Sequence, residues 1–245
     1  MKAQKHLGIA ALVLTTLASP LKAQIFEHEY TGDYFPNDPL TSPTWEQTFA
    51  GEDSTASVSG GVLTITAATG FDGPFAYRQA GAGWTGGALL GNTIEFVLRV
   101  DSQLSDWSQS VGIFTGPYGA NIVFTSTSVI HGALGGEFAS YSLNTNVFHT
   151  YRFTTSSTGL LSLYVDSNPT AAFAVQMQST GEYPANYLEF GATTAFGGGT
   201  VEWDSVRWTN NGAFAPVPEP ATLALLGLTG LLIIPLRRRL QGKLS

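Results

Sequence analysis

The sequence contains no cysteine, and it contains no lysine between residues 24 and 216. Without cysteine the chain has no disulfide cross-link, no thiolate metal ligand and no thiol nucleophile. Without lysine, the four arginines of this stretch face seventeen of the eighteen acidic residues, which leaves the stretch with a net charge of −13. A surface of this sign repels a polyphosphate backbone, so we expect no nucleic-acid partner.

Charged residues are scarce and turn-forming residues are abundant. Charged side chains make up 12% of the chain, and 28 glycines interrupt segments rich in threonine, serine and aromatic residues. This composition favours strands over helices, and residues 24–212 have an ordinary length for one domain.

Apolar residues recur at a period of two, as in strands with one buried face. The clearest cases are Leu63/Ile65/Ala67, Ile94/Phe96/Leu98/Val100, Leu161/Leu163/Val165 and Ala171/Phe173/Val175. Further strands are predicted at 111–114, 121–129, 137–143, 148–154, 187–191 and 200–208.

The first 23 residues have the three parts of a secretory signal peptide. Lys2 and Lys5 give a basic start, residues 7–18 are continuously apolar, and Ala23 supplies a small residue before Gln24. We expect signal peptidase to cleave between Ala23 and Gln24 after export through the Sec translocon. The apolar run has no polar face at a 3.6-residue period, which argues against an amphipathic first helix of the domain.

A second apolar segment, residues 221–236, lies near the other end and follows a linker at 213–216. As a helix that rises ~1.5 Å per residue it is about 24 Å long, which is short for a hydrocarbon core of ~30 Å. It therefore predicts a marginal transmembrane anchor that needs a thin or locally thinned bilayer. The cluster that follows it, Arg237, Arg238 and Arg239, places the C-terminus in the cytoplasm by the positive-inside rule.

Three features follow one another in residues 217–240. Val217, Pro218, Glu219 and Pro220 come first, then the apolar segment, then the arginine cluster. This order resembles a PEP-CTERM sorting tail. In that family an exosortase recognises the tail and cleaves it near Pro-Glu-Pro, and most carriers are Gram-negative bacteria that make exopolysaccharide or biofilm matrix. The resemblance implies a precursor held transiently in the inner membrane, with the mature form at the cell surface, the outer membrane or the extracellular matrix.

A candidate hairpin occupies the middle of the chain. Residues 148–153 and 161–166 alternate in polarity on either side of a turn-forming segment. The hairpin resembles the central one of concanavalin A-like and laminin G-like sandwiches, although Phe148 stands where those families have Trp and Ser167 where they often have Gly. Residues 199–208 likewise resemble the closing strand of such domains in PEP-CTERM proteins. The resemblance implies an all-β fold, an antiparallel jelly-roll β-sandwich.

Glu202 and Asp204 form the pair of acids best suited to catalysis. They lie two residues apart in a predicted strand, so their carboxylates would face the same side about 7 Å apart, a spacing that a glycosidase uses. Glucanases of this fold carry a third acid a few residues later, but Val206 and Arg207 stand there. We therefore interpret the pair as a solvated strand face and predict no catalytic residue.

Two histidines, His131 and His149, lie well inside the domain. Neither belongs to a spacing pattern typical of zinc sites or Ser-His-Asp triads. We interpret His149 as a hydrogen-bonded sheet residue and leave His131 unassigned.

Oxygen ligands suited to calcium occur in two places. Asp166 and Asn168 flank a predicted turn, and four further acids precede the first clear strand: Glu27, Glu29, Asp33 and Asp38. No D-x-D-x-D-G loop is present, and hydrogen bonding within the turn is the alternative role of Asp166. A structural Ca²⁺ at Asp166 and Asn168 is thus a hypothesis, and no cofactor is required.

Three aromatic residues, Trp84, Trp107 and Tyr118, lie in Gly- or Ser-rich segments outside the alternating strands. Exposed rings at these places would stack on sugar rings. The alternative is that each ring folds down on the core as a lid.

These features predict an exported, exosortase-processed protein of the cell surface or matrix. Its domain is predicted to be a non-catalytic module that binds polysaccharide or has a structural role in exopolysaccharide or biofilm. The alternative is a secreted glycan-active enzyme of the glycoside hydrolase type on the same sandwich.

Overall fold

The computed structural model describes residues 26–68, 75–81, 84–85, 89–103, 109–133, 136–181, 185–192 and 198–217. These residues form sixteen strands in two antiparallel sheets. The predicted signal peptide with Ala23 and Gln24, the loop residue Trp107, and the sorting tail from Pro218 onward lie outside the described residues. In the described ranges, no helix is long and apolar enough to cross a membrane.

The first sheet has eight strands. Seven of them follow the order β13 (Phe173–Gln176), β12 (Leu160–Val165), β11 (His149–Thr155), β6 (Asn92–Gln103), β16 (Gly199–Thr209), β4 (Val62–Ala67) and β3 (Thr55–Ser59). The eighth, β1 (His28–Thr31), pairs with the last part of β16, whereas β4 pairs with its first part. The N-terminal and C-terminal strands of the domain are therefore neighbours.

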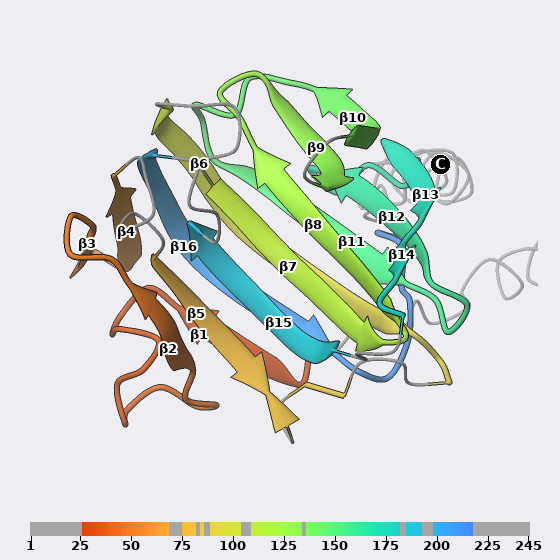
Figure 1. Ribbon diagram of the computed structural model, residues 1–245, viewed down its shortest axis with the longest axis horizontal. Coiled ribbons are helices and arrows are strands. Elements are labelled where there is room, and N and C mark those ends of the chain that lie inside the picture. The colour runs from red at the N-terminus through yellow and green to blue at the C-terminus, as the bar shows by residue number, and fades with distance from the viewer. Residues whose placement is uncertain are drawn as a thin grey trace, which may run out of the picture.

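The second sheet also has eight strands and lies in front of the first in Figure 1. Its order is β10 (Gly136–Ser142), β9 (Ser128–Ala133), β8 (Tyr118–Phe124), β7 (Gln109–Gly116), β15 (Ala185–Ala192), β5 (Phe75–Ala80) and β2 (Glu46–Ala50). The short β14 (Gln178–Ser179) pairs with β8. All pairings of both sheets are antiparallel, which allows each sheet to bury one face and leave the other in water.

The core lies between the two sheets and is rich in aromatic rings. On β6 the alternate residues Ile94, Phe96, Leu98 and Val100 are fully buried. Trp203 of β16 packs against one ring of its own sheet and two of the other, with centroids 4.8 to 6.4 Å apart: Phe96, Phe124 and Phe190. Because burial of one large apolar side chain stabilises a fold by about 1.5–3 kcal/mol, this layer holds the two sheets together.

The predicted hairpin and the predicted closing strand are confirmed. In the hairpin, β11 pairs with β12, and Phe153 lies opposite Leu163. The closing strand β16 lies between β6 and β4 and also pairs with β1. The single strand predicted at 121–129 is wrong, because Thr125 begins a turn that separates β8 from β9 and its amide donates to the carbonyl of Ser128.

Candidate functional site

All four arginines among the described residues form ion pairs with glutamates on neighbouring strands. Arg78 of β5 lies opposite Glu189 of β15, and their side chains approach to 2.7 Å. Arg99 of β6 lies opposite Glu202 of β16 at 2.8 Å. The other two arginines share one glutamate, as described next. Each guanidinium group is thus engaged by a glutamate of the protein itself.

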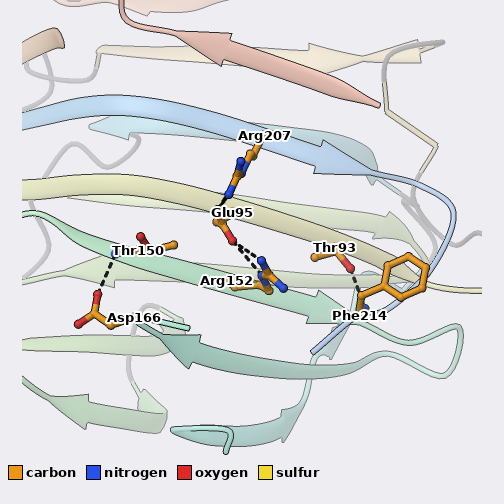
Figure 2. A network of polar contacts seen from close by, with 7 residues as sticks. All are labelled: Thr93, Glu95, Thr150, Arg152, Asp166, Arg207 and Phe214. Atoms are coloured by element: carbon orange, nitrogen blue, oxygen red, sulfur yellow. Dashed lines mark hydrogen bonds and ion pairs between the residues drawn. The ribbon is translucent and has the colours of Figure 1, made fainter. Parts of the chain in front are cut away.

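Glu95 lies at the centre of a three-strand ion-pair cluster on the outer face of the first sheet (Figure 2). Arg152 of β11 donates to one of its carboxylate oxygens at 2.7 and 2.9 Å, and Arg207 of β16 donates to the other. The ring of Phe26 covers the two guanidinium groups at 4.5 and 5.6 Å from its centroid. Glu95 is only 2% exposed, so two cations surround a buried anion. This cluster joins three strands and leaves no carboxylate oxygen for a ligand, so we interpret it as part of the framework of the fold.

Glu202 and Asp204 both lie on the outward side of β16, as expected, because Trp203 between them is fully buried. Strand β16 has a β-bulge between Trp203 and Ser205 in its pairing with β6. Both oxygens of Glu202 accept hydrogen bonds from Arg99, at 2.8 and 2.9 Å. A carboxylate held in this way is a poor proton donor or nucleophile, and Asp204 is exposed beside it.

Asp166 and Asn168 act as hydrogen-bond acceptors for the turn after β12. Asp166 and Ser167 have φ angles of 51° and 60°, and the amide of Asn168 donates to the carbonyl of Val165 at 3.0 Å. One Asp166 oxygen accepts from the amide of Thr150, and the other lies 2.7 Å from Nδ1 of His149. The Asp166 carboxylate therefore ties the turn to the neighbouring strand β11, whereas the sequence suggested hydrogen bonding within the turn. No group of three acidic or histidine side chains in the described ranges is arranged to hold a metal ion.

The residues predicted to stack on sugars do not form an exposed surface. Trp84 is completely buried, and its indole N–H donates to the carbonyl of Phe114 at 2.8 Å. Tyr118 is half-buried under the β11–β12 turn, where an added Cβ at Gly159 would come within 2.6 Å of the tyrosine Cγ. The prediction of stacking is thus wrong for Trp84, which is a lid on the core, and Tyr118 also packs inward.

A different pair of aromatic residues lies on the outer face of the second sheet, which faces the viewer in Figure 1. Phe114 of β7 lies directly opposite Tyr187 of β15, with ring centroids 4.3 Å apart and planes inclined by 32°. The guanidinium carbon of Arg78 lies 4.1 Å from the centroid of the Tyr187 ring. We refer to Phe114, Tyr187 and Arg78 as the aromatic platform. Both residues are partly buried, and neither belongs to the core between the sheets.

Two glycines leave the room that the Phe114 ring occupies beside Tyr187. An added Cβ would come within 3.0 Å of the ring at Gly112, its neighbour along β7, and within 2.7 Å at Gly119 on β8. Any other residue at Gly119 would push the ring outward. The glycines therefore decide the orientation of the platform.

A hollow of about 280 Å³ adjoins the platform on the side of β8 and β14. Phe114 forms part of its wall, and its polar lining comes from four residues: Asn121, Gln178, Ser179 and Thr180. The Thr180 hydroxyl donates to the carbonyl of Gly116 at 2.8 Å, which fixes that side of the rim. An aromatic face next to amide and hydroxyl groups suits a ligand with an apolar face and hydroxyl edges.

Glu189 anchors the platform from below. It is buried, and it accepts hydrogen bonds from Nε of Arg78 at 2.8 Å and from the hydroxyl of Thr48 at 3.3 Å. Burial raises the pKa of Glu189, and the contacts with Arg78 and Thr48 oppose that rise. The ion pair with Glu189 holds the guanidinium of Arg78 over Tyr187 and neutralises the charge of that guanidinium.

The same two-layer architecture occurs in solved proteins. Over 75% of this chain and 97% of the other, the conserved carbohydrate esterase from Shiga toxin-encoding bacteriophage phi24B matches with a TM-score of 0.53 and 14% identity. A glycosyl hydrolase family protein from Mycobacterium fortuitum matches over 76% of this chain and all of its own, with a TM-score of 0.50 and 15% identity. The chain has a concanavalin A-like sandwich fold.

The likeness to these proteins lies in the fold alone, because the identities are low. The metal-free Emp46p carbohydrate recognition domain also has a concanavalin A-like sandwich, with a TM-score of 0.48 and 13% identity over 76% of this chain and 97% of its own. No family model matches the sequence. No curated protein matches it either. The matches to the carbohydrate esterase and to the glycosyl hydrolase family protein thus confirm the expected sandwich.

Proposed function

We propose that this concanavalin A-like sandwich is a non-catalytic carbohydrate-binding module and that the aromatic platform is its contact surface. The observation that carries the proposal is the stacked, partly exposed pair of Phe114 and Tyr187 beside a hollow lined with amides and hydroxyls. A sugar ring has an apolar C–H face that packs on an aromatic ring and hydroxyl edges that hydrogen-bond to polar groups. The platform and the hollow offer both kinds of contact side by side.

The charge of the domain favours a neutral glycan. Residues 24–216 carry a net charge of −13. All four arginines already pair with glutamates, so no guanidinium among them is free to bind a uronate or a sulfate. An anionic polysaccharide would meet repulsion without compensation, whereas a neutral one would not.

The ends of the sequence support a role outside the cell. The signal peptide and the PEP-CTERM-like tail, with Val217, Pro218, Glu219 and Pro220, are those of an exported exosortase substrate. We propose that the module is released from the inner membrane and carried to the surface or matrix of a Gram-negative cell, where exopolysaccharide is the neighbouring polymer.

The alternative, a secreted glycan-active enzyme, receives less support from the arrangement of acids. The carboxylate at the platform is Glu189, and Arg78 donates to it through two nitrogens. Glu202 is held in the same way by Arg99. A general acid or nucleophile must reach the substrate, and both of these carboxylates are occupied by hydrogen bonds from arginine.

Affinity electrophoresis in gels that contain a neutral β-glucan, xylan or galactan tests the proposal, with alginate as the anionic comparison. We expect retardation by at least one neutral polymer and none by alginate. Phe114→Ala or Tyr187→Ala should weaken retardation roughly threefold to tenfold, from the ~0.5–1.5 kcal/mol that a stacked ring contributes. Tyr34→Ala is the matched control, because Tyr34 is exposed in the loop after β1.

Two results would contradict the proposal. Equal retardation of the Tyr187→Ala and Tyr34→Ala variants would show that the platform is not the contact surface. Release of reducing sugar from the polymer by the wild-type protein, lost on Glu189→Gln, would replace the binding module with the enzyme.

A further inference from the structure

The first and last described segments of the chain meet at one end of the sandwich. The amide of Glu27 donates to the carbonyl of Trp208 at 3.1 Å. The Glu27 carboxylate accepts hydrogen bonds from the Thr209 hydroxyl and the Asn210 amide, both at 3.1 Å. Both predicted apolar segments, 7–18 and 221–236, therefore join the domain at the same end. We call this end, where β6 begins and β11 and β16 finish, the tail pole.

The segment predicted as a linker is attached to the tail pole. The Thr93 hydroxyl donates to the carbonyl of Gly212 at 2.7 Å and accepts from the amide of Phe214 at 2.8 Å (Figure 2). The amide of Ala213 donates to the carbonyl of Leu90 at 3.2 Å. Pro216, directly before the predicted sorting motif, is buried. The chain thus has little slack between the domain and that motif.

The tail pole exposes large apolar side chains. Leu89 is 92% exposed and Leu90 is 69% exposed, next to the segment that carries the exposed residues Phe214 and Val217. Residues 89–93, 155–160 and 209–217 include no charged side chain, and the adjoining Glu27 adds a single one, in a domain with a net charge of −13. Apolar, uncharged residues gathered at one place on an acidic protein point to an apolar or anionic surface as the neighbour.

The distance to the predicted membrane segment is short. From Val217 to Ala221 the chain spans at most about 14 Å when fully extended. The headgroup layer on each side of the hydrocarbon core is roughly 5–8 Å thick. If Ala221 enters the hydrocarbon core, the tail pole must lie in or directly above the headgroup layer.

We propose that the tail pole is the membrane-contacting end of the precursor, with Leu89, Leu90 and Phe214 in the headgroup layer of the bilayer. This inference rests on the proposed insertion of the tail and is independent of carbohydrate binding. Glu27 is the charged side chain of the pole among the described residues, and it accepts hydrogen bonds from Thr209, Asn210 and Asn211. The pole therefore presents much less negative charge to anionic lipids than the acidic remainder of the domain. The orientation also presents the sorting motif at the membrane face, where a membrane-bound protease acts.

Single-cysteine variants test the orientation, because the chain has no cysteine of its own. Full-length Leu89→Cys and Leu90→Cys variants are labelled with an environment-sensitive fluorophore and reconstituted into phosphatidylethanolamine/phosphatidylglycerol vesicles. Val147→Cys is the control, since Val147 is 49% exposed and lies near Thr145, whose carbonyl accepts from Val100 far along β6. Asn92 and Val100 are eight positions apart on β6, which puts the control about 26 Å from the tail pole.

We expect the labels at 89 and 90 to shift to shorter emission wavelength and to be quenched by nitroxide-labelled lipid, with neither effect at 147. Flotation of the vesicles reports tail insertion separately. Protein that floats with the vesicles but shows water-like emission at 89 and 90 would overturn the inference, leave tail insertion intact and favour a protein partner for the pole. Protein that does not float would overturn both.

Discussion

The guanidinium group of Arg78 lies over the ring of Tyr187, with its central carbon 4.1 Å from the ring centroid. Tyr187 in turn stacks on Phe114, so one cation and two rings form a continuous surface across β5, β15 and β7. Glu189 keeps the guanidinium in place from the neighbouring position on β15. The platform and its anchor Glu189 form one unit, and single substitutions can perturb the anchor and the rings separately.

Removal of the anchor should loosen the platform. Glu189→Gln leaves the partly buried Arg78 without its counter-charge, and we expect a loss of about 1–3 kcal/mol in the free energy of unfolding, measured by urea denaturation. Retardation by a neutral glycan should also weaken, because Arg78 is no longer held over Tyr187. The double variant Arg78→Met/Glu189→Leu should recover most of the stability. A double variant no more stable than the single one would contradict this account.

Glu95→Gln should be far more damaging than Glu202→Gln. Glu95 is buried between two arginines, and breaking a buried ion pair costs about 3–5 kcal/mol. Glu202 pairs with one half-exposed arginine, and such pairs contribute about 0–1 kcal/mol. Urea midpoints of the two variants, which carry the same chemical change, provide the comparison. Similar midpoints would show that the cluster around Glu95 is an ordinary surface network.

His131 should make the domain less stable in mild acid. The side chain is buried, its Nδ1 lies 3.2 Å from the carbonyl of Asn121, and Nε2 has no hydrogen-bond partner among the described residues. Burial lowers the pKa of His131, so below the unfolded-state pKa of about 6.5 the unfolded chain binds more protons than the folded one. Stability should therefore fall as the pH drops from 7 to 5.

The His131→Leu variant isolates this effect. Its free energy of unfolding should change less between pH 7 and pH 5 than that of the wild type, as measured by urea denaturation at each pH. Parallel pH profiles of the two proteins would assign the acid sensitivity to other groups.

Gly119→Ala should change binding more than folding. The added methyl would come within 2.7 Å of the Phe114 ring and displace it from the sheet. We expect weaker retardation by the glycan, with a stability loss of about 1–3 kcal/mol from overpacking. Ser179→Ala removes a rim hydroxyl without moving the ring, so it should affect binding less. Unchanged retardation of Gly119→Ala would mean that the ring orientation does not matter.

The sheets were largely predictable wherever one face alternates. Leu63 and Ile65 on β4 and the residues of β6 follow a strict period of two because one face of each strand meets the core. The edge strand β2 is exposed or half-buried along its length, so its sequence shows no such pattern. The predicted 121–129 strand failed because residues 125–128 are all Thr or Ser, with no Gly, Pro, Asn or Asp to mark the turn between two apolar segments.

The candidate site was not predictable, because it depends on pairing between distant strands. Phe114 and Tyr187 are far apart in sequence, and only the register of β7 and β15 brings their rings together. Glu95 and Arg207 are separated by 112 positions. Alternation shows which face a residue occupies, but it does not show its neighbour on the next strand. Trp84, by contrast, lies in a Gly-rich segment typical of exposed loops. Its side chain is nevertheless buried, and its indole N–H donates to the carbonyl of Phe114.

The engagement of every arginine by a glutamate has a consequence for crowding. Copies of the domain have no unpaired guanidinium to offer to the carboxylates of a neighbour, so two copies at close range repel each other. At physiological ionic strength this repulsion extends about 8 Å, and in dilute fresh water it reaches several times farther. In the extracellular matrix that we propose as its location, the packing density of the protein should therefore follow the salinity of the surroundings.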